Sequence, residues 1–227
     1  MMKLREWLGR MLLKYAVQKP PVILDGKKKI ACVGDSITYG AGVLADRDVS
    51  TWEYFLEKML GTDFQVLNYG ISGRTLQQEG DLPYQKEKFW KITHEVRAEV
   101  YLLMLGTNDS KLYNWDAERF EQQYRKFVQS YQTLSWNPRV ILMAPPCCFE
   151  DPQTGVVGYD INGEIIKDIV RETVKKCAEE QNLEWIDLYT FTETHPEWFD
   201  DGVHPNKEGN QAIAEEIYRK IARNHAG

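Results

Sequence analysis

The sequence predicts an α/β domain built on a parallel sheet. Short apolar runs alternate with longer stretches in which apolar residues recur every three or four positions, and this alternation is typical of successive βαβ units. A chain of 227 residues is long enough for one sizeable domain of this kind and too short for two domains with a linker. We therefore expect one domain over residues 26–227, preceded by an N-terminal segment of residues 1–25.

Five short apolar runs predict the strands of that sheet. They are rich in Val, Ile, Leu and aromatic residues and are bounded by polar or glycine-containing segments. The expected strands span residues 30–33, 64–68, 100–105, 139–143 and 184–187. Their separation by helical segments favours a mostly parallel, five-stranded arrangement.

Stripes of apolar residues at helical spacing predict helices between the strands. They recur in residues 120–134, 166–177 and 213–221. These side chains are expected to face the core rather than a ligand. The chain has no internal repeat, low-complexity tract or Gly/Ser linker, which again indicates one domain.

Residues 1–25 predict an amphipathic helix followed by a lead-in. The residues on its apolar side are Leu8, Met11, Leu12 and Tyr15. Arg10 and Lys14 interrupt the apolar stretch and no small-residue cleavage site follows, so a secretory signal is not expected. We therefore expect a cytoplasmic protein without stable membrane insertion, while a peripheral contact of this helix with a membrane surface stays open.

The charge balance is acidic, with a formal net charge of -6 and a pI of about 5.4. Nucleic-acid binding needs a basic face, and the run at residues 27–29 is short and directly precedes a strand, as a solvated strand entry does. We expect no nucleic-acid partner.

Neither the cysteines nor the histidines have the spacing of metal ligands. Cys32, Cys147, Cys148 and Cys177 form no C-x-x-C pair, and Cys32 and Cys177 fall on predicted core positions, so free thiols are expected. His94, His195 and His204 show no metal-ligand spacing either. We expect no metal and no cofactor.

Glycines and small polar residues follow the predicted strands. The segments after the first four strands read GDS, NYGISGRT, GTNDS and APPCC. In an open parallel sheet, ligands bind beyond the carboxyl ends of the strands, where such residues bring backbone N–H groups and short side chains close to a reacting atom. The long irregular stretch 145–162 also follows a strand and is expected to form a wall of the site.

Ser36, Asp201 and His204 have the residue types of a nucleophile, an orienting acid and a base. Asp201 lies three residues before His204, so its carboxylate can reach the imidazole Nδ1–H and leave Nε2 to face Ser36. Each piece alone has a structural alternative, because Asp and Ser are common in turns and Asn108 could be a helix cap. Their joint occurrence after successive strands favours a catalytic site.

The sequence resembles the GDSL-type, or SGNH, hydrolases. Their four blocks are matched by GDSIT at residues 34–38, NYGISG at 68–73, GTND at 106–109 and DGVHP at 201–205. The resemblance implies a three-layer α/β/α, flavodoxin-like fold and a serine esterase. The common G-x-S-x-G elbow of α/β-hydrolases is absent, since Ile37 and Thr38 follow Ser36.

The resemblance also implies a role for each residue at its matching position. Ser36 would be the nucleophile, His204 the general base and then acid, and Asp201 the residue that orients the imidazole. The backbone N–H groups of Ser36 and Gly73 and the side-chain amide of Asn108 would form the oxyanion hole.

The sequence is closest in appearance to bacterial sialate-type and other carbohydrate O-acetylesterases. We expect substrate contacts from Asp35, Arg74, Trp115 and Pro146, with Arg74 facing a carboxylated sugar. The aromatic residues expected near the site are Tyr113, Trp115, Phe149 and Trp198. The structural alternatives are that these rings fill the core and that Arg74 pairs with a neighbouring acid.

Two other functions remain open at this point. A thioesterase or lysophospholipase would use the same residues with an apolar channel for a long acyl chain, and a non-catalytic binding module would keep the fold without the reaction. The expected partner is a small-molecule or glycan ester, and the sequence leaves the oligomeric state unknown.

Overall fold

A parallel five-stranded sheet forms the centre of the computed structural model, which describes residues 19–223. The strands lie in the order β2-β1-β3-β4-β5, and every neighbouring pair is parallel. The strands are β1 (Lys28–Gly34), β2 (Phe64–Gly70), β3 (Val100–Met104), β4 (Arg139–Ala144) and β5 (Glu184–Asp187). All five predicted strands are present, and their bounds differ from the predicted ones by two residues or fewer.

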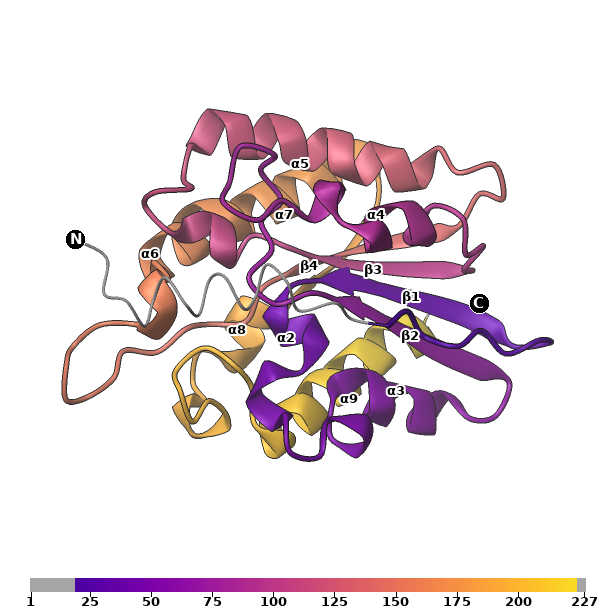
Figure 1. Cartoon of the computed structure of the whole chain (residues 1–227), viewed down its shortest axis with the longest axis horizontal. Coiled ribbons are helices and arrows are strands. Elements are labelled where there is room, and N and C mark those ends of the chain that lie inside the picture. Colours follow the sequence, from indigo (N-terminus) through magenta and orange to yellow (C-terminus); the bar gives the residue numbers. More distant parts are fainter. Residues whose placement is uncertain (1–18, 224–227) are drawn as a thin grey trace.

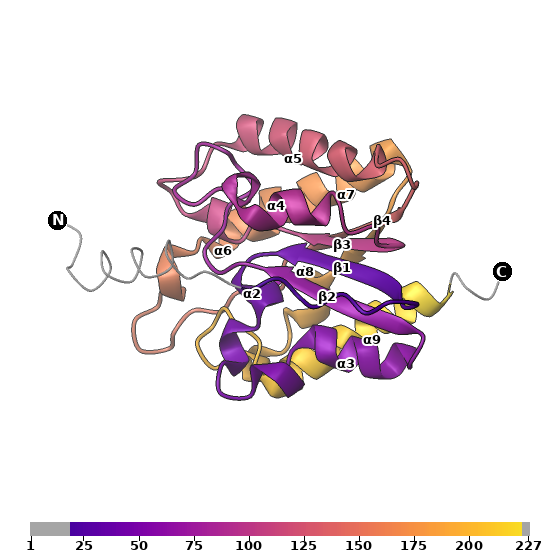
Figure 2. The ribbon, with the colours of Figure 1, turned by 45° about the vertical axis from the view of Figure 1, so that its right-hand side comes forward.

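Helices cover both faces of the sheet, as Figures 1 and 2 both show. One face packs against α4, α5 and α7, and the other against α3 and α9. The helices are α2 (Ser36–Tyr39), α3 (Trp52–Leu60), α4 (Lys88–Thr93), α5 (Ala117–Gln132), α6 (Gly163–Ile165), α7 (Arg171–Gln181), α8 (Leu188–Thr192) and α9 (Lys207–Arg223). The three-layer α/β/α fold expected from the sequence is confirmed.

The alternation of side chains along β1 explains why the strand is apolar throughout. Ala31 and Val33 join the core beneath α5 and α7, whereas Ile30 and Cys32 join the core beneath α3 and α9. All four are at most 1% exposed. Because both faces are covered, the strand lacks the polar alternation of a half-exposed sheet.

The helix expected over residues 166–177 is longer and less regular than its pattern suggests. α6 continues through a π-helical turn, Ile166–Val170, into α7.

α3 was not predicted, because Glu53 occupies a core-facing position and interrupts the apolar stripe of this helix. The N-terminus of α3 is capped by Thr51, whose hydroxyl accepts a hydrogen bond from the N–H of Tyr54 at 3.3 Å.

Glu53 gives a testable prediction for stability. Its side chain is 3% exposed, and burial raises the pKa of its carboxyl well above the usual value. The stability present at low pH is therefore lost as the pH rises through the folded-state pKa. We expect Glu53→Gln to raise the Tm by about 2 °C or more near neutral pH, with a smaller difference in acid.

Thermal unfolding of the wild type and Glu53→Gln across a pH series measures this effect. Glu208→Gln is the matched control, because Glu208 is exposed at the start of α9. A Glu53→Gln variant that unfolds at or below the wild-type Tm near neutral pH would contradict the prediction.

Residues 19–25 run beside the edge strand β2. The side-chain amide of Gln65 makes two hydrogen bonds to this segment: its oxygen accepts from the N–H of Leu24 at 3.0 Å, and its nitrogen donates to the carbonyl of Val22 at 2.7 Å. The amphipathic helix expected within residues 1–25 lies outside the described residues. Within residues 19–223, no helix combines the length and apolarity that crossing a membrane requires.

Candidate active site

The candidate site lies at the carboxyl end of the sheet, where β1 and β3 are neighbours. The chain leaves β1 toward α3 on one face and leaves β3 toward α5 on the other, so the two connections diverge (Figure 1). Such a point opens a crevice at the ends of parallel strands. The sequence predicted the site at this end of the sheet.

Ser36 stands where β1 ends and α2 begins. Gly34 permits the chain to turn here, because a Cβ at this position would lie 2.1 Å from the Thr38 hydroxyl and 2.8 Å from the Met104 carbonyl oxygen. Asp35 caps α2 by accepting from the N–H of Ile37 at 3.0 Å. Ser36 is thereby the first residue of α2, and its own N–H has no partner within the helix.

The turn before α9 fixes Asp201 and His204 relative to each other. Oδ1 of Asp201 accepts from the N–H of Val203 at 2.9 Å and from that of His204 at 2.7 Å. Gly202 lies between them at φ 77°, and a Cβ there would be 2.4 Å from the carbonyl oxygen of Phe149. The Asp-Gly pair therefore folds the carboxylate back toward its own imidazole.

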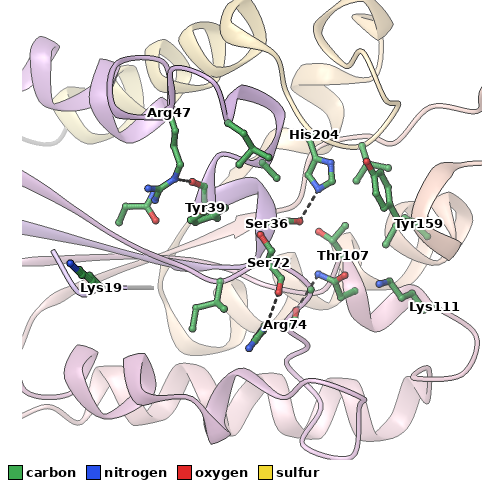
Figure 3. A pocket seen from close by; sticks show the side chains of 18 of the residues that line it. Lys19, Ser36, Tyr39, Arg47, Ser72, Arg74, Thr107, Lys111, Tyr159 and His204 are labelled. Carbon is green, nitrogen blue, oxygen red and sulfur yellow. Dashed lines mark hydrogen bonds between the residues drawn. The ribbon is translucent and has the colours of Figure 1, made fainter. Parts of the chain in front are cut away.

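A chain of hydrogen bonds joins Asp201, His204 and Ser36. Oδ2 of Asp201 is 2.7 Å from Nδ1 of His204, and Nε2 of His204 is 2.9 Å from Oγ of Ser36 (Figure 3). A carboxylate can only accept, so Nδ1 donates and Nε2 is the acceptor for the serine hydroxyl. Ser36 and His204 are 7% and 8% exposed.

Asp201 keeps its charge in this arrangement. Burial raises the pKa of its carboxyl, but the hydrogen bond and charge of His204 and the backbone N–H groups of His204 and Val203 outweigh burial and hold the pKa well below its usual range. The Asp201 carboxylate therefore stays ionised in mildly acidic, neutral and alkaline solution.

Asn108 and Gly73 lie with Ser36 around one cavity. The amide nitrogen of Asn108 donates to the carbonyl oxygen of Arg74 at 3.3 Å and to Oδ2 of Asp35 at 3.4 Å, and both of these hydrogen bonds are long. Gly73 lies in a turn closed by the N–H of Arg74 and the carbonyl of Ile71 at 3.4 Å.

The cavity has a volume of about 860 Å³ and opens over Ser36. In Figure 3, Tyr159 and Lys111 lie on one side of Ser36, and Tyr39 and Arg47 lie on the other. Its apolar lining consists of Leu44, Val66, Ile71, Ile161 and Val203. Lys19 and Pro21 extend the wall from the lead-in beside β2.

Comparison with known proteins fits this arrangement. Residues 32–212 match the GDSL-like Lipase/Acylhydrolase family. The chain belongs to this family. It is 29% identical over 212 residues to the acetylxylan esterase of Xylanibacter ruminicola, covering 85% of this chain and 43% of that protein. The chain therefore spans less than half the length of that curated relative.

Two solved structures have the same fold as this GDSL-like chain. Est24, a carbohydrate acetylesterase from Sinorhizobium meliloti, superposes with a TM-score of 0.68 at 21% identity, over 87% of this chain and 99% of the other. The aryl esterase of M. smegmatis gives a TM-score of 0.69 at 20% identity, over 86% and 99%.

The GTND block of this GDSL-like domain has a second residue that sequence reasoning missed. Asp109 is fully buried and accepts from the N–H groups of Leu76 and Gln77, both at 2.8 Å. Burial raises the pKa of Asp109 to about 6. Asp109 therefore ties the loop that carries Gly73 to the loop that carries Asn108, and its place beside Asn108 was the available signal.

Three of the expected substrate contacts do not line the cavity. Trp115 packs against Phe120 in the core beneath α5, with ring centroids 5.3 Å apart. Pro146 is buried after β4, and Asp35 is 1% exposed beneath α2, where its carboxylate is the helix cap. Local packing and capping place all three behind the surface that a substrate would meet.

Arg74 lines the cavity, but its guanidinium is bound to other groups. It donates to Oε1 of Glu87 from Nε at 3.0 Å and from Nη2 at 2.8 Å, and to the carbonyl of Ser72 at 2.8 Å. The side chain is 2% exposed. The structural alternative, pairing with a neighbouring acid, describes Arg74 correctly.

The other aromatic loop residues also lie away from the cavity lining. Phe149 packs against Phe199 at 5.3 Å, and Trp198 stacks on His195 at 3.8 Å. His195 also contacts Glu197 at 2.8 Å, precedes the short turn Pro196–Trp198 and does not line the cavity, in agreement with the loop residue that the sequence indicated. Tyr113 is 49% exposed and does not line the cavity.

The described cysteines are free, as the sequence predicted. Cys32 and Cys177 lie in the two main cores, and Cys147 and Cys148 follow β4. Across residues 19–223, the His, Cys, Asp and Glu side chains form no group of three or more that could hold a metal ion.

Proposed function

We propose that this protein is a serine esterase that removes acetyl groups from carbohydrates. The observation that carries the proposal is the hydrogen-bonded chain from Asp201 through His204 to Ser36, which ends at the cavity over the strand ends. A serine hydroxyl is a weak nucleophile until a positioned base accepts its proton, and this geometry supplies that base.

In the first half of the reaction, the ester acylates Ser36. As Oγ bonds to the ester carbonyl carbon, its proton passes to Nε2 of His204, and the carbonyl oxygen becomes an oxyanion. The imidazolium formed is stabilised by the Asp201 carboxylate. When the tetrahedral intermediate collapses, the C–O bond to the alcohol breaks and Nε2 returns the proton to the leaving oxygen.

In the second half of the reaction, water is the nucleophile and Ser36 is the leaving group. His204 takes a proton from water as the water oxygen bonds to the acyl carbon, and it then protonates Oγ of Ser36 as the carboxylic acid leaves. The N–H groups of Ser36 and Gly73 and the amide of Asn108 are the proposed donors to the oxyanion in both halves. One such donor typically lowers the activation barrier by about 3 kcal/mol.

The size and lining of the cavity support a small acyl group on a larger alcohol. An acetyl group fills only a small part of about 860 Å³, and the remaining space is bordered by groups that hydrogen-bond hydroxyls, such as those of Asn68, Ser72 and Thr107. The name of the curated relative above, acetylxylan esterase, agrees with this choice.

Acyl-chain selectivity tests the substrate class. If the enzyme is an acetylesterase, we expect kcat/KM for p-nitrophenyl acetate to exceed that for the octanoate by about tenfold or more. Release of acetate from acetylated xylo-oligosaccharides should occur as well. The Ser36→Ala protein gives the background for each substrate. A maximum at octanoate would instead support the thioesterase or lysophospholipase alternative.

A further inference from the structure

Tyr159 has a backbone conformation that needs an explanation. Its φ and ψ are 62° and 23°, and the next residue, Asp160, also has a positive φ of 61°. Two consecutive left-handed residues without glycine are costly, and Tyr lacks the local hydrogen bonding that makes this region accessible to Asn and Asp. Such conformations persist when surrounding contacts hold them, and they concentrate at functional sites.

The loop that carries Tyr159 is fastened to the turn that carries the triad acid. The N–H of Phe149 donates to the carbonyl of Gly202 at 2.8 Å, and Glu150 forms an antiparallel bridge with Val157. A Cβ on Gly158 would lie 3.5 Å from the carbonyl oxygen of Asp201. The hairpin therefore rests on the backbone around Asp201, and the left-handed turn that follows directs Tyr159 back to the site.

The Tyr159 side chain contacts both Asp201 and His204. Its hydroxyl donates to Oδ2 of Asp201 at 2.9 Å, and its ring lies edge-on to the imidazole with centroids 5.0 Å apart at 74°. Figure 3 shows Tyr159 beside His204 at the wall of the cavity.

This hydroxyl completes the hydrogen bonding of the Asp201 carboxylate. Oδ1 accepts from two backbone N–H groups, and Oδ2 accepts from Nδ1 of His204 and from the hydroxyl of Tyr159. A carboxylate has about four acceptor sites, so all are used and the group is held against rotation.

We propose that Tyr159 is a positioning residue of the catalytic machinery, which holds the Asp201 carboxylate in the orientation that aligns His204 with Ser36. The inference rests on the proposed esterase function. The 145–162 loop therefore forms a wall of the cavity and also adds a fourth side chain, Tyr159, to the hydrogen-bonded group of Ser36, His204 and Asp201.

The charges around the pair define how Tyr159 acts. Besides His204, Asp201 interacts electrostatically with Tyr159 and with the thiol of Cys148, and Asp35 at the start of α2 interacts electrostatically with His204. Burial and the neighbouring Asp201 raise the pKa of Tyr159 to about 12, so its hydroxyl stays a donor at working pH. A donor on Oδ2 draws charge away from the bond to Nδ1, and its loss strengthens the pull of Asp201 on the imidazolium.

The Tyr159→Phe variant tests this, because it keeps the ring and removes only the hydroxyl. We expect kcat for p-nitrophenyl acetate to fall about three- to tenfold with little change in KM. We also expect the acid limb of the pH profile to move about half a unit toward higher pH. Tyr113→Phe is the matched control, since Tyr113 is a loop tyrosine of similar exposure that does not line the cavity.

A double-mutant cycle separates positioning from a general structural role. In an Asp201→Asn background, the second change Tyr159→Phe should cost almost nothing further, because both act on the same contact. The same loss in both backgrounds, or a Tyr159→Phe protein with wild-type kcat and an unmoved acid limb, would overturn the inference. Failure of the esterase proposal is distinguishable, because the wild type would then be no more active than Ser36→Ala.

Discussion

Replacing Ser36 by Ala is expected to lower kcat/KM for p-nitrophenyl acetate on the order of 10⁵-fold or more. The change removes the only oxygen at hydrogen-bonding distance from Nε2 of His204 among the contacts of residues 19–223, so no acyl-enzyme can form. Loss of the nucleophile in a serine triad costs about as much as loss of the whole triad. Initial rates of p-nitrophenol release measure this effect.

Ser130→Ala is the control for Ser36→Ala. Ser130 lies on α5 and its hydroxyl donates to the carbonyl of Phe127 at 2.6 Å, away from the cavity lining. Its loss should leave kcat/KM within about twofold of the wild type. Equal rates for the wild type and Ser36→Ala would mean that Ser36 is only a turn residue after β1. They would support the alternative hypothesis of a non-catalytic binding module.

The second large effect is expected for His204→Ala, which removes the proposed base for Ser36 and the proposed acid for the leaving group in both halves of the reaction. We expect a loss of similar size to that of Ser36→Ala, and we expect the double variant to be no worse than either single one, because the residues act as a unit. His195→Ala is the control, since this ring stacks on Trp198 outside the cavity.

The pH dependence of the wild type follows from the same pair. Because the pKa of Asp201 is held low, its carboxylate stays charged over the pH range of an assay. We expect activity to rise with pH and then level off, because the proposed base can accept a proton only in its neutral form. A rate that stays flat from about pH 5 to about pH 8 would argue against His204 as the base.

The strands and the order of the layers were predictable because burial on both sheet faces leaves a continuous apolar signal. The helices with clean stripes, α5 and α9, were predictable for the same reason. α3 was missed because Glu53 is buried in its core-facing surface, an arrangement that depends on tertiary contacts.

The relative placement of Ser36, Asp201 and His204 could be anticipated because two local rules govern it. Strand ends of a parallel sheet gather at one edge, and an acid three residues before a histidine can fold back onto it. Asp109 stands beside Asn108 in the GTND block, but its hydrogen bonds to Leu76 and Gln77 join it to a loop distant in sequence.

The walls of the cavity could not be predicted from residue type. Trp115 and Phe149 are aromatic residues in loops, and an aromatic ring in a loop can pack against the core as readily as it can stack on a ligand. Tyr159 went unnoticed because nothing in its neighbours along the chain signals a positive φ. Its direction is set by the contact between its hairpin and Gly202, which is distant in sequence.

The most direct test of the account is to locate the nucleophile by covalent labelling. Incubation with an alkyl fluorophosphonate, followed by intact-mass measurement and peptide mapping, should show one adduct on the Oγ of Ser36, and labelling should stop hydrolysis. The Ser36→Ala protein should take up no label. An adduct on another residue, or continued hydrolysis by a fully labelled protein, would contradict the central claim that Ser36 attacks the ester.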